Sequence, residues 1–91
     1  MTYITNMILG ENMTIGNAYI DSNPQGAKLC IDGQPVLDST GTTVFTPVLI
    51  TDIPVGQRRF AFHFPGYYRE CINVDIIENQ TIDIFVTQIP K

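Results

Sequence analysis

The chain has 91 residues, of which 44% are hydrophobic and 15% are charged, and its formal net charge at pH 7 is −4. A chain of this length fits one domain, and its scattered basic residues do not form the stripe that a nucleic-acid-binding surface requires. No apolar run is long enough to cross a bilayer. We therefore expect one globular domain with no nucleic-acid partner and no membrane span.

The first fifteen residues are predicted to form an extension that precedes the main domain. Residues 2–9 are apolar and β-prone, and Gly10 then breaks the run. Two interpretations stay open, an extra edge strand on the same sheet or an arm that pairs with a neighbouring copy. The start lacks the positive charge and continuous apolar centre of a signal peptide. An intracellular start, a leader already removed and another export route therefore all remain open.

From residue 16 onward, apolar and polar residues alternate in short runs, the pattern of half-buried strands. Turn residues separate these runs, and a polar loop is expected over residues 34–44. The predicted strands lie at 16–22, 27–31, 45–51, 59–64, 71–76 and 82–87. No stretch has a helical period.

The strand at 59–64 carries the largest apolar side chains. Phe60, Phe62 and Phe64 alternate with Arg59, Ala61 and His63. Three aromatic rings on one face need a second layer to cover them, because each ring buries roughly 150–250 Å². The sequence therefore predicts an all-β fold: a single small antiparallel β-sandwich of about six or seven strands over residues 16–91, with an N-terminal extended arm over residues 1–15.

The turn residues recur in a fixed order along the chain. They are Pro24, Gly26 and Ala27 after the first strand, Asp32 and Gly33 after the second, Thr46 and Pro47 before the third, Gly56 in an Ile-Pro-Val-Gly turn, and then Gly66 and Tyr67. This order resembles a PEGA domain, a family named for a Pro-Glu-Gly-Ala motif, over residues 16–89. Gln25 stands where the family has Glu, and the connection from Gly33 to Thr46 is longer than is usual in the family.

The resemblance implies a small β-sandwich similar to transthyretin-like and carboxypeptidase-regulatory domains. Such modules recur in prokaryotic surface and envelope proteins, where they contact proteins or carbohydrates. They carry no catalytic residues and no cofactor, and their motif residues shape turns. From this resemblance we expect a cell-surface or extracellular location, with self-association or other envelope proteins as partners and a glycan as a further candidate.

The polar residues do not assemble into a recognisable catalytic or metal-binding pattern. His63 is the only histidine and has no acid or nucleophile beside it in the sequence. The segment from Asp38 to Thr42 holds one carboxylate, so a capped polar loop is favoured there over a weak ion site. We therefore expect no enzyme activity, no catalytic residue, no cofactor site and no metal site.

Cys30 and Cys71 are too few for a disulfide scaffold, and both a disulfide between them and two free thiols stay open. Asn12 and Asn79 each begin an Asn-X-Thr triplet, a candidate glycosylation site if the chain is exported.

Some large apolar residues are predicted to lie opposite the core faces of their strands. They are Tyr19, Leu49, Tyr68 and Phe85. Either the arm or the long loop covers them, or they form a contact patch for another subunit.

Two hypotheses about function follow from the sequence and the family resemblance. The first is a non-catalytic structural or adhesive module that self-associates through edge strands or the arm. The alternative is a monomeric accessory module that binds carbohydrate or protein through the 34–44 loop.

Overall fold

The computed structural model of the protein describes residues 2–3 and 14–91, and these residues form β-strands and no helix. The strands are β1 (Thr2–Tyr3), β2 (Ile15–Asn23), β3 (Lys28–Ile31), β4 (Gln34–Pro35), β5 (Val48–Pro54), β6 (Gly56–His63), β7 (Glu70–Ile76) and β8 (Thr81–Thr87). The predicted all-β class is confirmed. The six predicted strands correspond to β2, β3, β5, β6, β7 and β8, and β4 is an additional two-residue strand.

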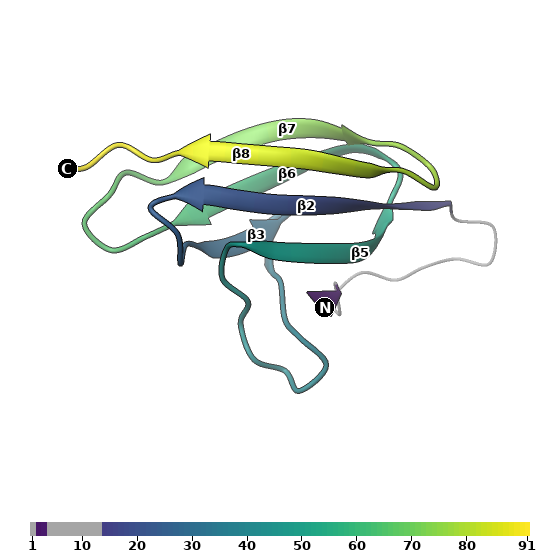
Figure 1. Cartoon of the computed structure of the whole chain (residues 1–91), viewed down its shortest axis with the longest axis horizontal. Helices are drawn as coiled ribbons and strands as arrows, with labels where there is room; N and C mark the ends of the chain where they lie inside the picture. Colours follow the sequence, from purple (N-terminus) through teal and green to yellow (C-terminus); the bar gives the residue numbers. More distant parts are fainter. Residues whose placement is uncertain (1, 4–13) are drawn as a thin grey trace.

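The strands form two four-stranded sheets that pack face to face (Figure 1). Sheet A has the order β1-β5-β2-β8, and sheet B has the order β4-β3-β6-β7. All neighbours in sheet B are antiparallel, as are β2 and β5. The pairs β2–β8 and β1–β5 are parallel. The predicted small sandwich is confirmed, but the prediction that it is antiparallel throughout is wrong for sheet A. Its two outer strands run parallel to their neighbours, so the sheet is mixed.

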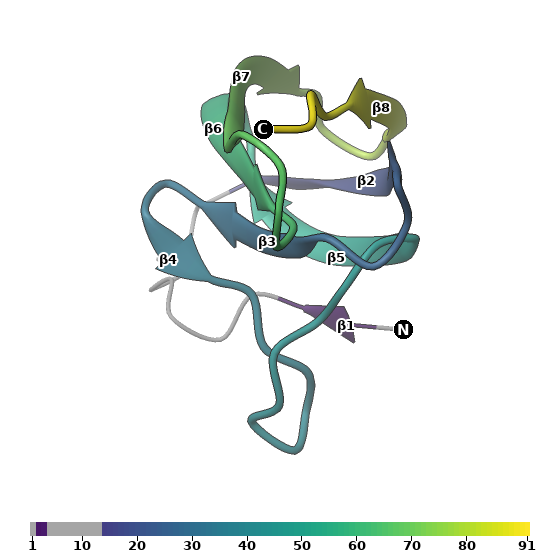
Figure 2. The same cartoon turned by 90° about the vertical axis from the view of Figure 1, so that its left-hand side faces the viewer.

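The turn over residues 77–80 carries the chain from sheet B to sheet A. As a result β7 and β8, the last strands of their respective sheets, lie on the same side of the sandwich (Figure 1, Figure 2). The loop between β4 and β5 projects from the opposite side (Figure 2).

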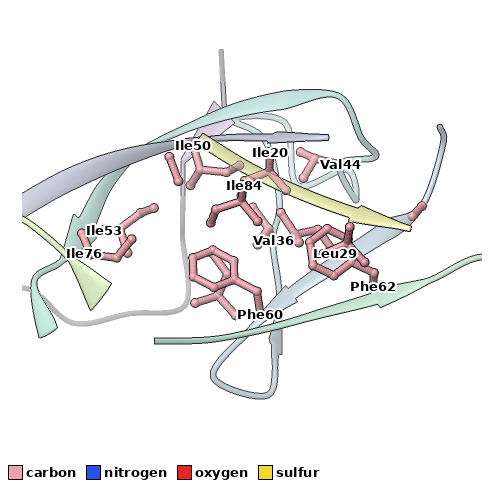
Figure 3. Packing of buried hydrophobic residues seen from close by; sticks show 14 residues of the cluster. Ile20, Leu29, Val36, Val44, Ile50, Ile53, Phe60, Phe62, Ile76 and Ile84 are labelled. Atoms are coloured by element: carbon pink, nitrogen blue, oxygen red, sulfur yellow. The ribbon is translucent and has the colours of Figure 1, made fainter. Parts of the chain in front are cut away.

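The core lies between the two sheets. Sheet A contributes Ile20, Ile50 and Ile84, and these side chains point toward Leu29, Phe60 and Phe62 of sheet B (Figure 3). The other buried members of the cluster are Ala18, Ala27, Ile31, Val36, Val44, Ile53, Ile76 and Val86. The predicted core faces are therefore confirmed for both sheets, since the side chains of a strand alternate between its two faces.

Two residues near the end of β6 depart from simple alternation. Ala61 is on the outer face of sheet B but is only 6% exposed, since Cys30 and Cys71 flank it on the neighbouring strands. Phe64 lies just past β6 and is half-buried, with its ring 5.5 Å from the ring of Tyr67. Burial against the facing sheet is complete for Phe60 and Phe62 and partial for Phe64.

The predicted polar loop at 34–44 is anchored by apolar side chains. Val36 and Val44 are buried, and the Val44 N–H donates to the Val36 carbonyl at 3.1 Å. Leu37 and Thr43 form a further bridge, so the base of this loop is a short ladder attached to the core. The polar pattern describes only its tip.

At the N-terminus, β1 pairs with β5 of the same chain, with Thr2 opposite Ile50. Residues 2–3 therefore lie at the edge of sheet A in the same chain. Residues 1 and 4–13 lie outside the described residues, and the domain boundary near residue 15 stays a prediction.

Candidate functional site

The turn residues after β2 meet the start of β5 at one buried hydroxyl, that of Thr46. Its Oγ1 accepts a hydrogen bond from the Ala27 N–H at 3.0 Å and lies 2.6 Å from the Ser22 Oγ. The Ser22 hydroxyl in turn donates to the Pro24 carbonyl at 2.8 Å. Ser22 and Thr46 are 1% and 4% exposed, so this cluster is part of the interior and offers no open binding site.

Gly26 and Pro47 lie on the solvent side of the same junction and are exposed. The Gly26 N–H donates to the Thr46 carbonyl at 2.9 Å, and the Thr46 N–H donates to the Ala27 carbonyl at 3.0 Å. Two backbone hydrogen bonds and the hydroxyls of Ser22 and Thr46 therefore join the turn after β2 to the segment before β5. A serine at a core-facing position of a strand is a signal for such a bond, but no hydrogen-bond partner was predicted for Ser22.

The Asp32-Gly33 turn is fixed to the start of β6. Both residues have positive φ, 51° and 82°, a conformation that Gly and Asp tolerate better than most residues. The Asp32 carboxylate accepts the Arg59 N–H at 2.9 Å and pairs with the Arg58 guanidinium at 2.9 Å. Gly56 opens the same strand β6. These residues set the register of sheet B.

The Gly66-Tyr67 turn holds the end of the chain. The Tyr67 N–H donates to the Phe64 carbonyl at 3.0 Å, and Tyr67 bridges to Pro90. The Lys91 N–H donates to the Gly66 carbonyl at 3.0 Å. This motif therefore ties the segment after β8 to the β6–β7 connection.

The two cysteines are both free thiols in this structure. Cys30 and Cys71 each pair with Ala61 from opposite sides, so they are two strand spacings apart, roughly 9–10 Å. Because a disulfide needs Cα atoms within about 7 Å, no bond between them within one chain forms in this arrangement.

His63 is exposed at the end of β6, opposite Lys28.

The tip of the 34–44 loop is organised by Asp38. Its carboxylate accepts the Thr40 hydroxyl at 2.6 Å and the backbone N–H groups of Thr40 and Thr42 at 2.9 and 3.0 Å. The bond from the Thr40 hydroxyl, followed by the Thr42 N–H, lowers the pKa of Asp38 below its ordinary value of 3.8. The capped polar loop is the arrangement found, with the carboxylate occupied by its own loop.

Of the two candidate glycosylation sites, Asn79 is exposed in the turn between β7 and β8, where its N–H donates to the Ile15 carbonyl at 3.0 Å. Asn12 lies outside the described residues. Occupancy of either site stays a prediction.

The outer face of sheet A carries exposed aromatic side chains. Tyr19 is 45% exposed and Phe85 is 63% exposed, on neighbouring strands. Leu49, opposite Tyr19 on β5, is half-buried. Tyr68 is 57% exposed but lies in the β6–β7 connection rather than on this face. The structure thus places Tyr19, Leu49 and Phe85 on one surface.

The described residues form no pocket and no cluster of three or more His, Cys, Asp or Glu side chains arranged to hold a metal ion. Among the same residues, none of the secondary structure is a helix able to cross a membrane.

Comparison with models of known protein families shows a match to the PEGA domain. The model of the PEGA domain matches residues 15–89, which is most of the chain. The matched segment begins at β2 and ends two residues after β8. No curated protein matches the chain.

Proposed function

The chain belongs to the PEGA domain family, and on this basis we propose that it is a structural module of a prokaryotic cell surface or extracellular assembly, joining copies of itself through edge strands or its N-terminal arm. PEGA is a family of small non-catalytic domains that typically occur in extracellular and surface proteins. The self-association and the prokaryotic surface setting are the parts that we propose.

The observation that carries the proposal is the side of the sandwich where β7 and β8 lie, which we call its open side because both strands have an unpaired edge among the described residues. β7 and β8 are seven residues each, and both are terminal strands of their sheets. A terminal strand exposes backbone N–H and C=O groups that can pair with another chain. Phe85 on β8 and Tyr19 on the neighbouring β2 add exposed aromatic surface at this side, which supports burial of these side chains against another subunit.

The N-terminal arm is the other candidate route. β1 is bound to β5 of its own chain, which supports the edge strands as the joining elements. Sedimentation equilibrium of the full chain and of a chain lacking residues 1–12 separates the two routes. If the edges join the copies, both proteins associate; if the arm does, the truncated chain is a monomer. A full chain that stays monomeric at millimolar concentration would refute self-association.

A second candidate function is that of a monomeric accessory module that binds a glycan or a protein. The hydrogen bonds that Asp38 accepts support this function, since they hold Thr40 and Thr42 in a fixed arrangement at the loop tip, away from the sheets. This function predicts a monodisperse monomer with saturable binding to envelope glycans. Replacing the tip residues 39–41 by a two-residue turn should abolish that binding, and unchanged binding would exclude the loop as the site.

A further inference from the structure

The free edge of β8 is defined by its hydrogen bonds to β2. The Asn17 N–H donates to the Gln80 carbonyl at 2.8 Å, and the Gln88 N–H donates to the Asn23 carbonyl at 2.9 Å. In a parallel ladder, alternate residues point their backbone groups at the partner strand, so the even-numbered residues of β8 face β2. Four residues therefore direct their N–H and C=O groups away from sheet A: Thr81, Asp83, Phe85 and Thr87.

Among the described residues, nothing pairs with these outward groups. The strand also lacks four of the features by which exposed edges avoid pairing, namely proline, lysine, bulges and short length. Six of its seven residues are Thr, Ile, Phe or Val, the types that favour extended structure, and Asp83 is its single charge. By contrast, β4 has two residues and contains Pro35. β7 carries both Glu70 and Asp75.

The sequence of β8 fits a second copy of itself in antiparallel orientation. Outward-pointing residues must lie opposite outward-pointing residues, which restricts the two-fold axis to a few positions. An axis at Asp83 places two carboxylates directly opposite each other, and an axis at Ile84 leaves them as diagonal neighbours about 7–8 Å apart. An axis at Phe85 pairs each Asp83 with a Thr87 hydroxyl and separates the carboxylates by four residues.

We propose that two copies of the protein associate through β8, antiparallel about an axis at Phe85, so that the two copies of sheet A become one continuous sheet. Phe85 then lies directly opposite the Phe85 of the second copy on the outer face, where the residue is 63% exposed in the single chain. In this register the outward N–H and C=O groups form hydrogen bonds between the two copies, within the Phe85–Phe85 pair and within each Asp83–Thr87 pair. This inference rests on the proposed function, since it specifies which edge joins the copies and in which register.

The neighbouring surface is compatible with this pairing. β8 lies at the open side of the sandwich, away from the projecting loop between β4 and β5 (Figure 2). The segment after β8 turns toward the β6–β7 connection, where the Tyr68 N–H donates to the Ile89 carbonyl at 2.8 Å. That bond withdraws Ile89 from the edge, so Thr87 is the last residue of the strand with outward backbone groups.

Cysteine cross-linking tests the register. The Cα atoms of Phe85 and its counterpart would be about 5.5 Å apart, within the range of a disulfide. Phe85→Cys should therefore give a disulfide-linked dimer under mild oxidation. Thr87→Cys is the matched control on the same strand and face, because its two copies would be offset by about 13 Å along the strands. The wild type, which carries the same Cys30 and Cys71, is the control for native thiols.

Substitution by lysine tests the interface without new thiols. Phe85→Lys should raise the dimer dissociation constant at least about tenfold, since it removes a ring pair and places like charges opposite each other. Phe45→Lys, at an aromatic residue that is 52% exposed on another segment, should leave it unchanged. A wild type that dimerises without a Phe85→Cys cross-link overturns this interface and leaves the proposed function standing. A monomeric wild type overturns both.

Discussion

The hydroxyl of Thr46 should be among the most sensitive polar groups of the fold. Thr46→Val keeps the shape of the side chain and removes the oxygen that accepts the Ala27 N–H at 3.0 Å and meets the Ser22 hydroxyl at 2.6 Å. Since Thr46 is 4% exposed, water does not replace the lost partner. The variant therefore tests whether the turn motif stabilises the fold through this buried cluster.

The size of the effect follows from the groups left unpaired. A buried donor without an acceptor costs about 1–3 kcal/mol, and the Ser22 hydroxyl keeps its bond to the Pro24 carbonyl, so the main loss is that of the Ala27 N–H. Together with the weakened contact to Ser22, we expect a loss of about 2–3 kcal/mol in the free energy of unfolding. For a domain of this size that corresponds to a melting temperature lower by roughly 10–20 °C.

Urea titration and thermal unfolding followed by circular dichroism measure both quantities. Thr51→Val, at a half-buried position within β5, is the matched control and should change the free energy of unfolding by no more than about 0.5 kcal/mol. The double variant Ser22→Ala, Thr46→Val should lose less than the sum of the single variants, because both remove the same contact. If Thr46→Val is as stable as Thr51→Val, the buried hydroxyl cluster does not stabilise the fold.

Three further predictions concern the turns and the loop. Gly16→Ala should lower the free energy of unfolding by at least about 2 kcal/mol in urea titration, since its Cβ would collide with the Ile77 carbonyl oxygen; a near-neutral variant would contradict this packing. Thr40→Val should raise the pKa of Asp38 toward 3.8 in a carboxyl NMR titration. Because the pKa of Asp38 is lowered in the folded state, the stability that its carboxylate contributes is present above pH 3.8 and is lost as the pH falls through the folded pKa. The free energies of unfolding of the variant and the wild type should therefore converge in strong acid. Asp32→Ala should be about 1 kcal/mol less stable than Asp32→Asn by thermal unfolding, because Asn still accepts the N–H from β6; equal stability would contradict a role for that bond.

Much of the fold follows from local pattern. Alternation alone assigns Ile20, Leu29, Phe60 and Ile84 to the interior, because a side chain's face depends only on its position along its own strand. Turn chemistry places the reversals at Asp32-Gly33 and Gly66 for the same reason.

What sequence pattern leaves open is which strands are neighbours. The parallel pairing of β2 with β8 joins residues more than sixty positions apart, and alternation is identical for parallel and antiparallel partners. The burial of Val36 and Val44 was also missed, because isolated valines in a polar segment give no period. The same limit applies to the cysteines, whose separation is set by the strand β6 between them.

The parts of the chain that define the family are not the parts that we expect to bind. The Thr46 hydroxyl, the Asp32 carboxylate and the Gly66 carbonyl are each hydrogen-bonded within the chain. Groups already paired inside the protein have little left to offer a partner. The outward backbone groups of β8 have no such partner among the described residues. It follows that a change in the turn motif should alter stability first, whereas a change on β8 should alter association with little effect on folding.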